Sequence, residues 1–258
     1  MTQYAGRFMR FSGFCCRCLA PLAAHGAGAS RMPGADGEGL FGLSRAPHHE
    51  AGEVGPENPK YQCPVSIDTA SVKAAAEPFE LRLEDDALEV LHTGHTIQVS
   101  FEGRSSLSRG GRVWHLVQLH FHTPSETCFD GAAFPMETHF VFSDDDGRLL
   151  VLGAFAAESA SGTANPALAT LLASAPDEAE DPVPIHGWHP DALLPADRHF
   201  YAFPGSLTTP PYTEPVDWIV YQAPAQASRA QLEAMAAILG DNTRPVQPLN
   251  GRPIEEGR

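Results

Sequence analysis

The stretch that decides the fold runs from Trp114 to Glu126 and reads WHLVQLHFHTPSE. Its apolar and aromatic residues predict a strand, which we place at residues 113–122. Alternate residues of a strand lie on the same face. One face would carry two imidazoles and an amide, and the other, which is nearly all apolar, is expected to be core. The first face holds Trp114, Leu116, Gln118, His120 and His122, and the second holds Val113, His115, Val117, Leu119 and Phe121.

A third histidine lies on a second predicted strand, residues 136–143, within the sequence METHFVF. By the same alternation, Glu137, His139 and Val141 share one face of this strand. If the two strands pair antiparallel, His139 comes opposite the first two histidines, so that three imidazoles converge. An isolated histidine is usually an ordinary satisfied or exposed side chain, and it is the combination that favours a metal site.

Three neutral imidazoles suit a zinc ion at zinc–nitrogen distances of about 2.0–2.1 Å. Three protein ligands leave a fourth position for water, which is typical of catalytic rather than structural zinc. Zinc lowers the pKa of that water to about 7 and makes hydroxide available at neutral pH. Gln118 and Glu137 each precede a histidine by two residues on the same face. We predict that each accepts the free ring N–H of its neighbour.

The rest of the chain predicts many strands and few helices. Further strands are expected at residues 80–84, 88–92, 95–101, 149–155 and 216–221. One helix should begin at Asn165-Pro166 and end near Ala173, and another should follow Ser228, whose spacing from Gln231 matches a capping box. The predicted fold class is a mainly β single domain with one large sheet and a few short peripheral helices.

The first 35 residues differ from the rest in composition. The formal net charge is −15, yet no Asp or Glu precedes Asp36. Residues 1–35 carry arginines, a weak apolar stretch and small residues around Ala29, which indicates an export signal; a transit peptide or a disordered tail are the alternatives. We therefore expect a leader over residues 1–35, one domain over residues 36–258, and a periplasmic or secreted protein or, alternatively, an organelle-targeted one.

The composition disfavours nucleic-acid and membrane partners. An acidic surface repels nucleic acid and anionic lipid, and no run approaches the ~20 apolar residues of a membrane span. Beyond the leader the cysteines are Cys63 and Cys128, which could pair or could both be small buried thiols. No oligomeric state follows from the sequence.

Five segments together resemble the α-class carbonic anhydrases. QLHFHTPSE (118–126) resembles the family segment with the first two zinc histidines, and METHFVF (136–142) resembles the one with the third. YAFPGSLTTPPYTEPVDWIVY (201–221) resembles the loop and strand that close the active site. YQCPVSIDT (61–69) and NTRPVQPLNGR (242–252) resemble an early segment and the C-terminal signature. The resemblance covers roughly residues 46–254.

The resemblance implies a twisted, mainly antiparallel sheet of about ten strands, with zinc at the bottom of a conical cleft. It implies reversible hydration of CO2 to bicarbonate and a proton by zinc-bound hydroxide. His120, His122 and His139 would be the ligands of one zinc ion. Thr208 would orient the hydroxide, donate to Glu126 and help to hold the substrate through its N–H. Thr209 would lie beside the bicarbonate site, and His95 would shuttle the proton. The apolar wall that receives CO2 would be Val141, Val151, Leu207, Val216 and Trp218.

The chain departs from the family pattern near its N-terminus. The segment between Glu57 and Gln62 is several residues shorter than usual, and an expected tryptophan and tyrosine have no clear counterparts. Tyr212 stands where bacterial members often carry a cysteine bonded to one in the missing segment. These departures put the speed of proton transfer and the stability in question rather than zinc binding.

Two alternatives remain open from the sequence. His120, His122 and Glu126 fit the first metal motif of a cupin, in which Glu126 would be a ligand to iron or manganese, although the glycine of the second motif is missing after Pro135. The other alternative is a non-catalytic zinc-binding module on the carbonic anhydrase fold.

Overall fold

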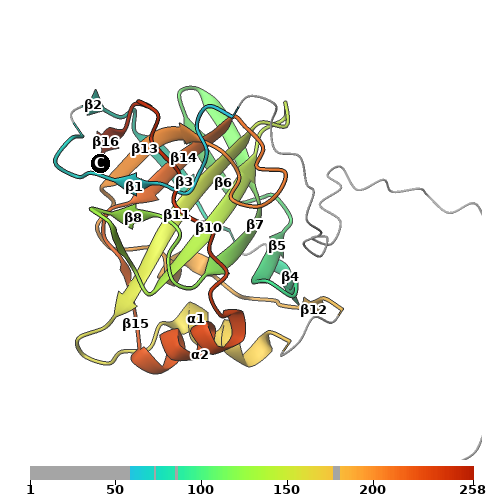
Figure 1. Cartoon of the computed structure of the whole chain (residues 1–258). Coiled ribbons are helices and arrows are strands. Elements are labelled where there is room, and N and C mark those ends of the chain that lie inside the picture. The colour runs from blue at the N-terminus through green and yellow to red at the C-terminus, as the bar shows by residue number, and fades with distance from the viewer. Residues whose placement is uncertain (1–58, 73, 85–86, 177–180) are drawn as a thin grey trace, which may run out of the picture. The chain divides into compact units, whose positions relative to one another are not determined.

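The structure is a computed structural model that describes residues 59–72, 74–84, 87–176 and 181–258 (Figure 1). All of these residues belong to one compact unit of the chain. The predicted leader, residues 1–35, lies outside the described residues, and so do residues 36–58 at the start of the expected domain.

A mixed sheet of 13 strands forms the body of the described chain. Its main path runs, in order, through β12 (Val183–Pro184), β4 (Ala87–His92), β5 (Ile97–Phe101), β7 (Arg112–His122), β10 (Met136–Ser143), β11 (Leu149–Glu158), β14 (Val216–Tyr221), β13 (Phe200–Gly205), β16 (Glu255–Gly257) and β2 (Ala74–Ala75). Off this path, β6 (Ser106–Arg109) pairs with β7 and with β3 (Phe79–Arg82), and β15 (Ala225–Ala227) pairs with β11. A separate small sheet contains β1 (Ser66–Ile67), β8 (Cys128–Phe129) and β9 (Ala132–Ala133).

The sheet confirms the predicted fold class and corrects it in detail. Most pairs are antiparallel, but β11 runs parallel to both β14 and β15, and β16 runs parallel to β2. The strand expected from His95 begins only at Ile97, because residues 93–96 form a turn in which Thr93 N donates to Thr96 O at 2.8 Å. Strand β13 was not predicted; it contains Pro204, and proline lowers the strand signal because it lacks an N–H for the ladder.

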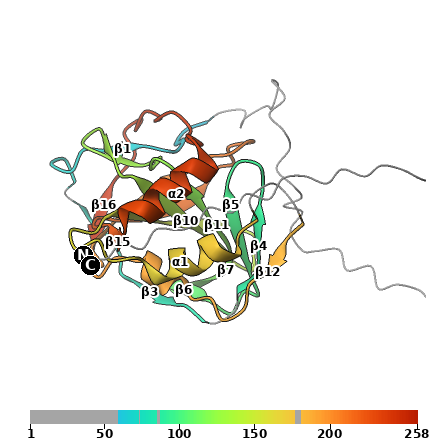
Figure 2. The same cartoon turned by 90° about the horizontal axis from the view of Figure 1, so that it is seen from below.

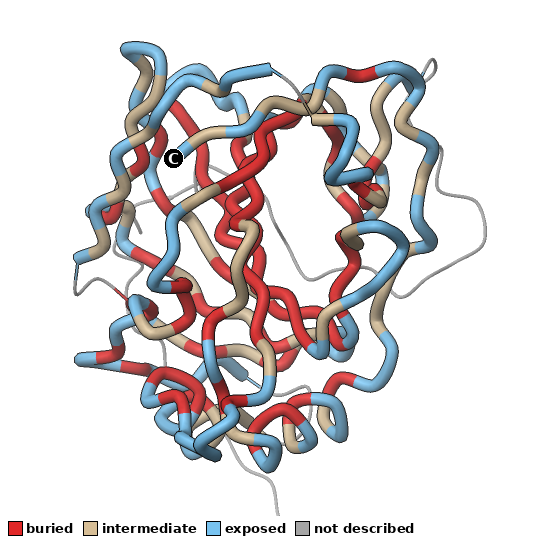
Figure 3. Tube along the Cα trace, turned by 90° about the vertical axis from the view of Figure 1, so that its left-hand side faces the viewer, coloured by how far each residue is buried: buried red, intermediate tan, exposed pale blue. Residues whose placement is uncertain are grey.

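Two apolar clusters occupy opposite faces of the sheet, as the alternation along β10 shows. Phe140 and Phe142 belong to the larger cluster, and Val141 between them belongs to the smaller one. Leu168 and Met235 place both helices on the larger cluster, and Figure 2 shows these helices side by side across one end of the strands. Buried residues follow the central strands, and exposed residues lie mostly around them (Figure 3).

The face assignment for the first half of β7 is wrong because a β-bulge interrupts the strand. Gln118 lies opposite Val141, whereas Leu116 lies opposite Phe142, so Val117 is the extra residue. A bulge of this kind exchanges the faces of the residues on its two sides. The residues that join the larger core are Trp114, Leu116, Leu119 and Phe121, while Val113 and His115 are exposed.

Two α-helices, α1 (Pro166–Ser174) and α2 (Arg229–Leu239), match the predicted ones, and a short 3-10 helix, η1 (Pro190–Leu193), adds a turn. The capping box is present: Ser228 Oγ accepts from Gln231 N at 3.3 Å, and Gln231 Oε1 accepts from Ser228 N at 3.1 Å. The Gln231 side chain also exchanges two hydrogen bonds of 2.7 Å with the backbone of Asn165, at the start of α1. No helix among the described residues is long and apolar enough to cross a membrane.

We expect Gln231→Leu to lower the free energy of unfolding by about 2 kcal/mol, because it leaves the buried N–H of Asn165 without a partner and removes one of the two donors to its C=O, the other being Ala169 N. The measurement is urea unfolding of the full chain. The matched control is Ser228→Ala, which removes only the cap and should cost about 1 kcal/mol. Equal losses in the two variants would show that the link between the helices contributes nothing.

Candidate metal centre

The register of β7 and β10 brings the three predicted histidines together. His139 lies directly opposite His120 in this antiparallel pair, and His122 follows two residues along β7. The three ring centroids are separated by 5.1, 5.2 and 4.5 Å. One nitrogen from each ring lies within 4.8 Å of the other two, so one ion could be shared by all three.

Each ring turns its other nitrogen towards an oxygen atom. The three distances are 2.9 Å from His120 Nδ1 to Gln118 Oε1, 3.1 Å from His139 Nε2 to Glu137 Oε1, and 3.3 Å from His122 Nδ1 to the backbone oxygen of Asn242. An acceptor at one nitrogen fixes the tautomer of a neutral ring and leaves the other nitrogen for a metal. The nitrogens left in this way are Nε2 of His120, Nε2 of His122 and Nδ1 of His139. Of these, His122 Nε2 is buried and has no hydrogen-bond partner.

Burial decides the protonation of the first two imidazoles. Loss of water lowers the pKa of His120 to about 3, with a further contribution from His139, and it also lowers the pKa of His122. Burial acts in the same direction on His139, but the carboxylates of Glu137 and Glu126 outweigh it and raise its pKa. The centre therefore offers two neutral imidazoles and a third, His139, that its neighbouring carboxylates favour in the charged form, so a divalent cation could take the place of the His139 proton.

Glu126 lies behind the histidines and is held by a distant part of the chain. Its Oε1 accepts the Arg244 N–H at 2.8 Å, and its Oε2 lies 3.5 Å from His122 Nε2. Burial raises the pKa of this carboxyl to about 7, against the lowering effects of His139, the Arg244 amide and the Thr208 side chain. Oε2 makes no hydrogen bond with the described groups. This oxygen is therefore the one that could accept from Thr208 when ionised, and a nearby cation would favour the ionised form.

An apolar row lies beside the histidines on the same face of the sheet. Val141 follows His139 by two residues, pairs with Val151 of β11, and Val151 pairs in turn with Trp218 of β14. The Trp218 ring meets the His139 ring edge to face, with centroids 5.0 Å apart. All five predicted wall residues belong to the smaller apolar cluster or pack against it: Val141, Val151, Leu207, Val216 and Trp218.

The other predicted residues lie on loops. Thr208 is buried and Thr209 is exposed, both in the connection from β13 to β14. This connection is anchored where Trp218 Nε1 donates to Ser206 O at 2.9 Å. His95 is exposed in the turn from β4 to β5, and its carbonyl accepts from Asn242 Nδ2 at 2.9 Å.

Two residues at the centre, Asn242 and Gly153, were not singled out from the sequence. Besides reaching His122 and His95, Asn242 accepts from Thr123 N at 3.0 Å, so it fastens the C-terminal segment to the end of β7. Gly153 lies opposite His139, and a Cβ at this position would come 2.9 Å from Glu137 Oε1. A glycine inside an apolar strand often marks such a close approach, and that signal was present in the sequence.

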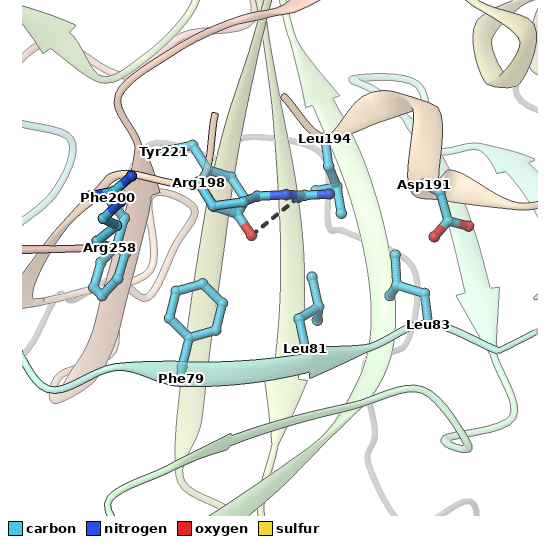
Figure 4. A pocket seen from close by; sticks show the side chains of 9 residues that line it. All are labelled: Phe79, Leu81, Leu83, Asp191, Leu194, Arg198, Phe200, Tyr221 and Arg258. Atoms are coloured by element: carbon cyan, nitrogen blue, oxygen red, sulfur yellow. Dashed lines mark hydrogen bonds between the residues drawn. The ribbon is translucent and has the colours of Figure 1, made fainter. Parts of the chain in front are cut away.

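A surface pocket of about 260 Å³ lies on the opposite face of the sheet (Figure 4). Its lining includes Phe200 and Tyr221, which belong to the larger apolar cluster. Arg198 crosses the pocket and donates to the Tyr221 hydroxyl at 3.3 Å, with its guanidinium 5.3 Å from the ring centroid. The arginine covers an aromatic surface in this pocket. The three histidines that could hold a metal ion, His120, His122 and His139, do not line it.

Comparisons with known proteins agree with this geometry. A family model described as eukaryotic-type carbonic anhydrase matches residues 52–258. A carbonic anhydrase of Pectobacterium atrosepticum is 40% identical over 205 residues, which are 77% of this chain and 80% of that protein. One from Neisseria gonorrhoeae is 38% identical over 199 residues, which are 76% of this chain and 77% of that protein.

A solved structure is similar over the same part of the chain. The α-carbonic anhydrase of Thermovibrio ammonificans, in complex with the inhibitor sulfanilamide, gives a TM-score of 0.71 at 39% identity and covers 77% of this chain and 87% of that one. The cupin alternative is therefore wrong, since one large open sheet replaces the double-sheet jelly roll of that fold. The chain belongs to the eukaryotic-type, or α-class, carbonic anhydrase family of enzymes.

Proposed function

We propose that this chain binds one zinc ion through His120, His122 and His139 and catalyses the reversible hydration of CO2 to bicarbonate and a proton. The observation that carries the proposal is the convergence of three imidazoles beside an apolar row, with His122 Nε2 buried and unpartnered among the nitrogens left for a metal. Zinc bound there would lower the pKa of a water to about 7 and supply the hydroxide nucleophile.

The residues around the histidines would bind and orient the reactants. CO2 is apolar, so the row of Val141, Val151 and Trp218 offers it a matched surface next to the nucleophile. If ionised Glu126 accepts the Thr208 hydroxyl proton, the Thr208 oxygen is left as an acceptor only. It then accepts the hydrogen of the attacking oxygen and turns a lone pair of that oxygen towards CO2. The exposed Thr209 would meet the bicarbonate product.

The proton released in each cycle must leave the centre. An exposed imidazole can accept a proton near neutral pH and pass it to buffer. His95 lies on the turn that Asn242 ties to the end of β7, which places it near the histidine cluster. We assign the proton-shuttle role to His95.

The remaining alternative is a non-catalytic zinc-binding module. Zinc binding alone requires neither the buried Glu126 carboxylate that accepts from the Arg244 amide nor the Thr208 hydroxyl, so these two groups favour a catalytic role. Location stays a separate proposal: export, or organelle targeting, would depend on residues 1–35.

Stopped-flow CO2 hydration by the full chain, with zinc measured on the same sample, tests the function. We expect about one zinc per chain and hydration that sulfanilamide blocks, since this inhibitor binds the similar Thermovibrio enzyme. His139→Ala should lose both zinc and activity. The control is His199→Ala, which changes a partly exposed histidine beside Asp197 and should keep both. Full zinc occupancy without hydration would establish the binding module instead.

Glu126→Gln should leave zinc bound and lower kcat by roughly a hundredfold, because the amide can donate to Thr208 and so misdirects its hydroxyl. Turnover and metal content are measured together. Loss of zinc from this variant would mean that Glu126 is itself a ligand, and unchanged turnover would remove it from the mechanism.

His95→Ala should lower kcat by roughly tenfold to a hundredfold in dilute buffer, since proton export then lacks its relay. Added imidazole should restore much of the rate by accepting the proton from solution. His115→Ala is the control, because His115 is also an exposed histidine and lies near the start of β7, where its ring contacts the Gly103 carbonyl. An equal effect of both substitutions would contradict the assignment.

A further inference from the structure

Tyr212 has an unusual backbone conformation. It is in the loop that carries Thr208 and has a φ of +60°, in the left-handed region that residues with a Cβ seldom occupy. Such a residue persists only where its surroundings hold it in place, and these positions cluster near functional sites. The contacts of the Tyr212 ring and backbone are therefore informative.

Arg244 lies over the Tyr212 ring. Its guanidinium carbon lies 3.7 Å from the ring centroid, well within the range of a cation–π contact. The Tyr212 backbone is fixed as well, because its N–H donates to Thr209 O at 2.9 Å and its carbonyl accepts from Gln62 Nε2 at 3.1 Å. The ring thus joins the Thr208 loop to the C-terminal segment.

Arg244 in turn reaches the catalytic centre through its backbone. Its N–H donates to Glu126 Oε1 at 2.8 Å, and its Nη1 donates to Gln62 Oε1 at 2.8 Å and to Cys63 O at 2.7 Å. Glu214 closes the network, since its carboxylate accepts from Gln62 Nε2 at 2.6 Å. Three segments far apart in the sequence therefore meet at the Gln62 side chain: its own segment, the Thr208 loop and the C-terminal segment. The loop carries Thr208, and the C-terminal segment binds Glu126 through the Arg244 amide.

We propose that Tyr212 is a positioning residue for this pair, acting through the stack of its ring on Arg244. The ring fixes the guanidinium, the Arg244 amide stays aimed at Glu126, and the Thr208 loop stays at a constant distance from that carboxylate. This proposal rests on the proposed hydration activity, in which the pair orients the attacking oxygen. It assigns no contact with substrate to Tyr212, whose hydroxyl is not needed.

The test compares three substitutions in the zinc-loaded full chain. Tyr212→Phe keeps the ring, Tyr212→Ala removes it but keeps the backbone strain, and Tyr212→Gly removes both. We expect Phe to match the parent, and both Ala and Gly to lower kcat for CO2 hydration by about tenfold with unchanged KM and zinc content. A role that lay only in the backbone would leave the Gly variant fully active.

A second measurement does not depend on activity. Hydrogen exchange of the Arg244 amide reports the bond to Glu126, and losing the stack should speed this exchange by about two- to thirtyfold in the Ala and Gly variants but not in Phe. Tyr61→Ala is the matched control, because that ring lies 5.3 Å from the guanidinium of Arg252 rather than on Arg244. It should leave the Arg244 amide unchanged.

The two readouts separate the possible failures. If the parent protein binds zinc but does not hydrate CO2, the proposed function fails, and the exchange rates alone decide the role of Tyr212. If the parent is active and the Ala and Gly variants match it in kcat and in exchange, the positioning role is wrong. Equal losses in the Phe and Ala variants would also overturn it, because they would place the effect in the hydroxyl.

Discussion

The register of β7 against β10 from Gln118 onward is the constraint on which the rest of the structure depends. His120 and His139 meet because they are direct partners in this ladder. A slip by one residue would turn His139 to the opposite face, since side chains alternate along a strand. Core packing prevents the slip: Phe140 must enter the larger cluster while Val141 enters the smaller one. The same register continues into β11 and β14, which place the apolar row beside the histidines.

Alternation along each strand, together with an assumed antiparallel pairing of the two strands, predicted the histidine cluster. From Gln118 onward β7 is regular, so the shared face of His120 and His122, and the support of His120 by Gln118, follow from spacing alone. Before Gln118 the same rule failed, because the bulge at Val117 exists only in relation to the partner strand. The strand β13 escaped prediction for a different reason, namely the proline within it.

Contacts between distant segments could not be read from periodicity. Asn242 and Arg244 reach residues about 120 positions earlier in the chain, His122 and Glu126, through a backbone carbonyl and a backbone N–H. Every residue type has the carbonyl, and all except proline have the N–H. No local pattern encodes such a contact. The expectations for Thr208, Thr209 and His95 rested on the family resemblance, and only their places in the loops are visible here. The structure adds the reason why the C-terminal segment matters to a centre built on two central strands.

Buried polar side-chain atoms without hydrogen-bond partners are concentrated at the candidate metal centre. Buried polar side chains elsewhere in the described chain have partners in most cases: Gln231 uses both ends of its amide, and buried Arg252 donates to several backbone carbonyls. Among the described residues, the buried side-chain atoms without a hydrogen-bond partner belong, with the exception of Trp114 Nε1, to His122, Glu126, Glu137 and His139. An orphaned buried polar atom is unfavourable by about 1–3 kcal/mol. Random imperfection would scatter such atoms through the core, whereas here they converge on one point between two strands. Glu137 Oε1 and His139 Nε2 lie 3.1 Å from each other. A cation held beside the rings would supply the missing partner of His122 Nε2 and compensate the neighbouring Glu126 carboxylate, so binding there is coupled to the stability of the fold.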